Sequence, residues 1–253
     1  MADSPSLLDL LEARSGLVCA VGAGGKKSLL NTLAALHPGR VALTASVGTT
    51  GFPALPRFEV VIDADAALAA RVAALDAGAS VAYACPSEHA GRHAGARLPT
   101  IEGIHARGGF EVSYVKADGA RMRWIKAPDA DEPVLPAGCS TVISVVSARA
   151  MGEPLDARVA HRIAQLRQVT GLAMGERITP AHVGRLIAHP AGLMKAPPGC
   201  RVVAVINMVD DDAREALARA AAEAALALEP RLRRVVLTRL KRPEDPLVAV
   251  VER

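Results

Sequence analysis

The sequence predicts an α/β fold, in which a mostly parallel, P-loop-like sheet is flanked by helices and carries a small helical insertion. Three observations lead to this prediction. Short apolar runs alternate with amphipathic stretches along the chain. A glycine-rich turn, VGAGGKKS at 21–28, joins the first apolar run to the first helical stretch. The composition is 51% hydrophobic but only 2% aromatic, so the core is expected to be aliphatic. We expect residues 1–253 to form one domain, with the insertion at about 150–195.

The predicted strands are short and apolar, which is typical of strands buried in a parallel sheet. They lie at 16–22, 40–46, 58–63, 80–85, 110–120, 121–128, 140–148, 201–210, 233–240 and 247–252. The strand at 110–120 is expected to run into a tight turn at Asp118-Gly119, because Asp-Gly is a strong turn signal.

The predicted helices have apolar residues at helical spacing. They lie at 6–13, 26–36, 64–78, most of 155–188 apart from TGLAMGERITP, and 211–228. Ser4 is expected to cap the first helix, and Thr179, followed by Pro180, to cap a helix of the insertion. Residues 86–110 are rich in Gly, His and Arg and are expected to form a loop or a mobile segment.

Composition and charge favour a cytoplasmic protein without a membrane or nucleic-acid partner. No run approaches the ~20 apolar residues that a membrane span needs, and the N-terminus lacks a signal-peptide pattern. The four cysteines are widely spaced, as in a reduced protein. The basic cluster at 231–242 surrounds a strand-like VVL run. Its basic residues are explained equally well as solvated residues flanking a strand, so a nucleic-acid surface is not predicted.

The turn at 22–28, called the glycine loop below, is a candidate phosphate site. A P-loop reads G-x-x-x-x-G-K-[ST], and its amides and lysine hold phosphates while its hydroxyl holds Mg²⁺. Here Gly25-Lys26 fits, but Lys27 stands at the hydroxyl position and Ser28 follows one residue late. The alternative is a strand-to-helix turn that needs glycine only for its backbone angles. The phosphate interpretation takes in Gly22, Ala23, Gly24, Gly25, Lys26, Lys27 and Ser28, with ATP or GTP as ligand.

Polar residues at two other strand ends are further candidates. Asp118 follows a strand where a nucleotide hydrolase places an acid that orients a metal ion or a water molecule; the alternative is an ordinary turn. Asn207 and Asp210 have the spacing of the guanine-reading motif N-K-x-D, with Met208 in place of the lysine. For the carboxylates we favour a different role, in which Asp210 or Asp211 caps the helix at 211–228.

A zinc site is considered and not predicted. Cys85, His89 and His93 are spaced at steps of four, which would place them on one helical face. Pro86 and Gly91 weaken such a helix, and a fourth ligand is not evident, so surface histidines are the preferred interpretation.

Six blocks, taken in order, resemble those of one family. They are GAGGKKS (22–28), LTASVGTT (43–50), VKADGARMRWIKAPDADEPVLP (115–136), MGEPLDARVAHR (151–162), ITPAHVGRLIAHPAGLMKAPPG (178–199) and INMVD (206–210). In this order they resemble the YqeC proteins, which are described as accessory proteins of selenium-dependent hydroxylases. The resemblance implies a P-loop-like, nucleotide-binding cytoplasmic protein that serves the maturation of molybdenum hydroxylases requiring selenium. It implies as partners a molybdenum hydroxylase or another cofactor-maturation protein, and it adds His161 and Arg162, the H-R pair of the family, to the site.

Three departures from the family pattern fall in the implied nucleotide site. Lys27 replaces a hydroxyl, Lys116 replaces a glutamate, and Met208 replaces a lysine; in addition, the threonine run after the second strand is reduced to Thr44 and Ser46. Two new lysines in place of possible metal ligands suggest that an anion binds without Mg²⁺. The chain would then be a non-hydrolysing module that binds a phosphate or a cofactor. A third possibility is a divergent ATP-dependent enzyme of pterin or one-carbon cofactor biosynthesis, so catalysis is left open.

Overall fold

The computed structural model describes residues 5–253, and its centre is one nine-stranded sheet. The strands of this sheet are β1 (Gly16–Gly22), β2 (Val41–Ala45), β4 (Phe58–Ile62), β5 (Ser80–Ala84), β7 (Val112–Lys116), β9 (Cys139–Ser147), β11 (Arg201–Asn207), β12 (Arg234–Thr238) and β13 (Leu247–Glu252). Their order is β13-β12-β11-β9-β1-β7-β2-β5-β4, and every neighbouring pair is parallel except the antiparallel edge pair β12–β13. The predicted α/β fold with a mostly parallel sheet is therefore confirmed.

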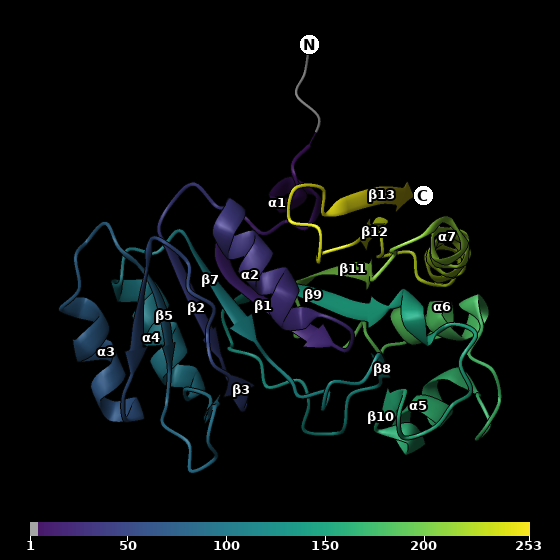
Figure 1. Ribbon diagram of the computed structural model, residues 1–253, viewed down its shortest axis with the longest axis horizontal. Coiled ribbons are helices and arrows are strands. Elements are labelled where there is room, and N and C mark those ends of the chain that lie inside the picture. Colours follow the sequence, from purple (N-terminus) through teal and green to yellow (C-terminus); the bar gives the residue numbers. More distant parts are fainter. Residues whose placement is uncertain (1–4) are drawn as a thin grey trace.

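Helices cover both faces of the sheet (Figure 1). They are α1 (Leu7–Leu10), α2 (Lys26–Leu36), α3 (Asp65–Ala73), α4 (Leu98–Arg107), α5 (Ile163–Thr170), α6 (Pro180–Ala188) and α7 (Asp212–Leu228), with a 3₁₀ turn at Ala148–Ala150. Alternate residues of β1 belong to different cores, since Val18 packs with α1 and α2, whereas Cys19 packs with α3 and α4. Farther along the sheet, Ile206 of β11 packs with α6 and α7. No helix within residues 5–253 combines the length and the apolar character that crossing a bilayer requires.

The segment 86–110 is better ordered than its composition suggests. The prediction of a loop or mobile segment is wrong for α4 and for the short strand β6 (Arg92–His93), which pairs with β3 (Thr49–Thr50). Ile101 and Ile104 are buried against the sheet, and Pro99 lies in the first turn of α4, where a proline is tolerated. The Gly and His content of the flanking turns concealed this short apolar stripe.

The predicted strand at 121–128 and the predicted turn at Asp118-Gly119 are both wrong. Only β8 (Ile125–Lys126) is extended, and it pairs with β10 (Ala160–His161) outside the main sheet. The turn lies instead at Arg121-Met122, where both residues have positive φ (45° and 61°). Asp118 does not initiate a turn, because its carboxylate is directed at buried lysines, as described below.

Several helix boundaries also differ from the prediction. The first helix is only α1, and Ser6 caps it together with Asp9; the predicted cap Ser4 lies outside the described residues. Residues 155–162 are not helical, and α3 ends at Ala73 rather than at 78. Thr179 caps α6 as predicted, and its hydroxyl accepts a hydrogen bond from the amide of His182.

Candidate functional site

The candidate site lies where the carboxyl ends of β7, β1, β9 and β11 meet at one edge of the sheet. These four strands are adjacent and parallel, so the loops that follow them converge. The chain leaves β1 through α2 toward β2 on one side and later passes β1 to reach β9 on the other (Figure 1). In open α/β sheets, ligands bind at such a reversal of strand order.

The fold itself requires the glycines of the glycine loop. Gly22, Gly24 and Gly25 have φ values of +89°, +92° and +125°, where side chains are strained. A Cβ atom on Gly24 would lie 2.7 Å from the backbone nitrogen of Ser147, and one on Gly22 would strike the carbonyl of Val145. Backbone angles and close packing thus account for the glycines whether or not an anion binds.

The loop nevertheless presents free backbone donors at the start of α2. The amide of Gly22 donates to Asp118 Oδ2 (2.9 Å) and that of Ala23 to the carbonyl of Val145 (2.8 Å). Within residues 5–253, the amides of Gly24 through Lys27 have no acceptor in hydrogen-bond geometry. Such amides and the helix dipole favour an anion, so this part of the loop can cradle a phosphate group.

Lys26 is turned back into the protein and pairs with Asp118. Its Nζ lies 3.0 Å from Asp118 Oδ1 and also donates to the carbonyl of Gly22, and its side chain is only 5% exposed. Burial lowers the pKa of Lys26, although the carboxylate of Asp118 partly offsets this effect. In this conformation the ammonium group is already neutralised by the protein.

Asp118 is a buried counter-ion for two lysines. Its Oδ2 accepts hydrogen bonds from Lys126 Nζ and from the amide of Gly22, both at 2.9 Å. Burial alone would raise the pKa of Asp118, but the charges of Lys26 and Lys126 outweigh burial and hold the pKa below its usual value. The carboxyl group therefore stays ionised; Oδ2 is hydrogen-bonded, whereas Oδ1 faces Lys26 as an ion pair and has no hydrogen-bond partner within residues 5–253.

The line of charges continues from Lys126 into the insertion. Lys126 Nζ lies 2.7 Å from Glu132, and Arg162 contacts Glu132 at 3.7 Å and Asp129 at 2.6 Å. Positive and negative groups alternate along this line, which joins the glycine loop to the start of α5. Arg162 has a positive φ of 59° and a buried Nε without a partner in residues 5–253. His161 pairs with Lys126 between β10 and β8, and burial, followed by repulsion from Lys126, lowers its pKa.

Lys27 and Lys116 line the same small cavity beside the glycine loop. Its volume is about 10 Å³, close to the space that one water molecule needs. Lys27 Nζ donates to Thr50 Oγ1 (2.8 Å), and Lys116 Nζ donates to the carbonyl of Gly48 (2.8 Å). Burial, reinforced by the charge of Lys26, lowers the pKa of Lys116 to about 8. In this conformation the two lysines hold the 48–51 segment against the start of α2.

Asn207 fixes the glycine loop to the end of β12. Its Nδ2 donates to the carbonyl of Gly24 (2.8 Å), and its Oδ1 accepts from Thr238 Oγ1 (3.0 Å) and from the amide of Leu240 (3.3 Å). The Asn207 side chain is buried, and its amide group is already hydrogen-bonded within the protein rather than to a nucleotide base. Asp210 pairs with Arg214 at 3.6 Å, while Asp211 caps α7, which confirms the capping interpretation for Asp211.

Asn207→Ala is expected to lower the free energy of unfolding by roughly 2 kcal/mol, because it leaves three buried polar groups without a partner. Urea unfolding measures the effect. Asn31→Ala is the matched control, since Asn31 is half-buried in α2, where alanine is a good helix former. Equal stability of the two variants would contradict the positioning role of Asn207.

Other candidates are dispersed, and two residues of the site were not predicted. Ser28 is exposed on α2, and the 85–93 segment forms a turn that leads into β6 rather than a helix. Residues 5–253 contain no group of three or more His, Cys, Asp or Glu side chains arranged to hold a metal ion. Sequence reasoning missed Glu132 and Asp129. Both belong to the block APDADEP, which directly follows Lys126.

Comparisons with known proteins identify similar chains. A family model described as "YqeC protein" matches residues 18–164. A protein of Escherichia coli (strain K12) with the description "Uncharacterized protein YqeC" is 32% identical over 209 residues, which cover 81% of this chain and 80% of that protein. No solved structure matches the chain.

Proposed function

Because the chain belongs to the YqeC family, we propose that it is a nucleotide-binding accessory protein for maturing or building the cofactor of a selenium-dependent molybdenum hydroxylase. The selenium and molybdenum parts of this proposal rest on the family resemblance. The nucleotide part rests on the glycine loop. The protein would act in the cytoplasm, where its cysteines, all free within residues 5–253, stay reduced.

The observation that carries the proposal is the set of amides from Gly24 to Lys27, which have no acceptor in residues 5–253 and lie at the start of an eleven-residue helix and at the strand-order reversal. A phosphate placed there would accept hydrogen bonds without displacing any protein acceptor from these amides. The residues fit Mg²⁺ less well, because Lys27 and Lys116 offer donors where a hydroxyl and a carboxylate would offer ligands.

Phosphate would have to compete with Asp118 for Lys26. The ammonium can reach a ligand only by lengthening its 3.0 Å contact with the carboxylate. Lys126 and the Gly22 amide would still hold Asp118 after such a movement. Lys26 can therefore be exchanged between carboxylate and phosphate without leaving Asp118 unpaired.

A second candidate function is a module that binds a phosphorylated ligand without hydrolysing it. The state of Asp118 favours this alternative, because a carboxylate with a lowered pKa, bound to two lysines, is a poor general base. On this alternative, Lys27 and Lys116 supply the positive charge that Mg²⁺ supplies elsewhere.

Thermal unfolding with ATP, GTP and their diphosphates, each with Mg²⁺ and with EDTA, tests both candidates. A nucleotide at ~100 times its Kd is expected to stabilise the protein by about 2.7 kcal/mol, which raises Tm measurably. Lys26→Ala should abolish the rise, whereas Lys241→Ala, which removes an exposed lysine, should not. A rise that persists in EDTA without release of phosphate supports the non-hydrolysing module. No rise with any of the nucleotides would contradict the nucleotide-binding proposal.

A further inference from the structure

A large pocket lies at the amino ends of the strands, whereas the glycine loop lies at their carboxyl ends. Its volume is about 730 Å³, within the range of about 300–1,000 Å³ that is common for small-molecule sites. It includes Arg201, the first residue of β11, whereas Asn207 at the other end of β11 contacts the glycine loop. At about 3.3 Å per residue, roughly 20 Å of strand separates the two regions.

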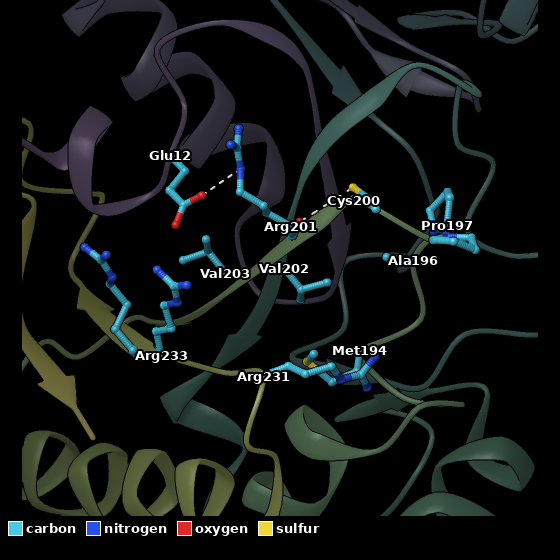
Figure 2. Close-up of a pocket in the computed structure, with 13 residues that line it drawn as sticks. Glu12, Met194, Ala196, Pro197, Cys200, Arg201, Val202, Val203, Arg231 and Arg233 are labelled. Carbon is cyan, nitrogen blue, oxygen red and sulfur yellow. Dashed lines mark hydrogen bonds and ion pairs between the residues drawn. The ribbon is translucent and has the colours of Figure 1, made fainter.

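Arginines from two chain segments converge on this pocket (Figure 2). Arg201 lines it from β11, and Arg231, Arg233 and Arg234 line it from the segment that leads into β12. Of the acidic residues, only Glu12 lies in the lining, and Figure 2 shows it paired with Arg201, at 2.7 Å. The lining therefore carries four positive charges and one negative charge.

Acidic neighbours outside the lining neutralise this charge only in part. Arg231 pairs with Glu229 at 2.7 Å, and Arg234 lies 4.0 Å from Glu252. Arg233 is exposed and makes no ion pair within residues 5–253. Counting these pairs, one unit of positive charge remains, on a guanidinium group that can bind two oxygens of a phosphate at once.

The remaining wall of the pocket is apolar. Met194, Pro197, Val202 and Val203 line it. An inorganic anion would leave this surface in contact with water, whereas an organic body would cover it. The lining thus fits a molecule that has an anionic head and an apolar portion.

We propose that this arginine pocket is a second ligand site, which binds an organic phosphate through Arg233 and Arg234 and packs the organic portion against Met194 and Val202. The site is independent of the function proposed for the glycine loop. Glu252 can release Arg234 to the phosphate, since its carboxylate is exposed and the contact is long, at 4.0 Å.

Isothermal titration calorimetry with 4-nitrophenyl phosphate, a phosphate joined to an aromatic ring, measures the Kd that tests the proposal. The wild-type protein should bind it more tightly than inorganic phosphate or 4-nitrophenol. Replacing both Arg233 and Arg234 by alanine should weaken binding by roughly tenfold or more. Lys241→Ala combined with Arg242→Ala is the matched control, because it removes two exposed charges just beyond the other end of β12 and should leave the affinity unchanged.

Two further variants keep the outcome decisive. Arg233→Glu reverses an exposed, unpaired charge and should abolish binding without lowering Tm. Lys26→Ala should bind 4-nitrophenyl phosphate as the wild-type protein does, so failure of the glycine-loop proposal would not affect this one. Absence of saturable binding, or binding that is lost in Lys26→Ala and retained in Arg233→Glu, would overturn the proposal.

Discussion

Asp118→Asn is expected to lower the free energy of unfolding by about 3–5 kcal/mol at pH 7. The substitution keeps the size of the side chain and removes the negative charge between two buried ammonium groups, Lys26 at 3.0 Å and Lys126 at 2.9 Å. Taking one partner out of a buried ion pair is costly, because the other charge stays desolvated without compensation. Here two cations lose the same carboxylate, and within residues 5–253 only Lys126 keeps a second one, Glu132.

Asp210→Asn is the matched control, since it also converts an aspartate to asparagine, at a position that pairs only loosely with Arg214. Its contact with Arg214 is long, at 3.6 Å, and its side chain is 37% exposed, so the expected loss is below about 1 kcal/mol. Urea unfolding of both variants at pH 7 measures the difference. Similar stabilities would show that the Asp118 ion pairs contribute little.

The difference between wild-type protein and Asp118→Asn should depend on pH with a defined sign. The folded-state pKa of Asp118 is lower than its unfolded-state value, so the unfolded chain binds the proton more readily. The stabilisation by the carboxylate is then fully present above about pH 4 and decreases as pH falls through the folded-state pKa. The two proteins should converge in acid and differ most near neutrality. A difference that grows in acid would contradict this assignment.

Adding Lys26→Met to Asp118→Asn should restore part of the lost stability, because it removes the cation that loses its carboxylate partner. Lys26→Met alone should have a smaller effect than Asp118→Asn, since Asp118 keeps Lys126 and the amide of Gly22. The four proteins form a double-mutant cycle whose coupling energy measures the Lys26–Asp118 pair. Additive effects would mean that the pair is not formed.

The order of the elements could be predicted from the sequence because the spacing of apolar residues and the turn and capping residues are local signals. The apolar run at 16–22, the glycine loop and the helix at 26–36 have the predicted boundaries in the structure. Thr179 and Asp211 cap their helices for a reason that involves only the next three residues. Helix α4 was missed because its apolar stripe is short and lies between glycine-rich turns.

The pairing of the site residues could not be predicted, because it depends on contacts between distant parts of the chain. Lys26 and Asp118 were both identified as candidates, but with separate roles, and they are 92 positions apart in the sequence. Adjacent placement of β1 and β7 brings them together. The sequence also holds no local sign that Asn207 binds the carbonyl of Gly24, because that contact requires β11 to lie two strands from β1.

Gly24→Ala is expected to lower the free energy of unfolding by about 3 kcal/mol or more. A positive φ of 92° strains an alanine by roughly 1–2 kcal/mol, and its Cβ would lie 2.7 Å from Ser147 N. Relief of that overlap requires β9 and the glycine loop to separate, which adds roughly 1–3 kcal/mol. Urea unfolding in the absence of any nucleotide measures the loss.

Gly119→Ala is the matched control, since it introduces the same methyl group beside Asp118, at a position with open space around the added Cβ and no positive φ. Its expected effect is within about 0.5 kcal/mol of zero. A large loss in Gly24→Ala alone would mean that the strand-to-helix turn needs its glycines before any ligand is present. The glycines then carry no information about phosphate binding, and the nucleotide-binding proposal rests on the amides of Gly24 through Lys27, which lack an acceptor within residues 5–253. If Gly24→Ala is instead as stable as Gly119→Ala and loses only nucleotide binding, the glycines serve the ligand rather than the fold.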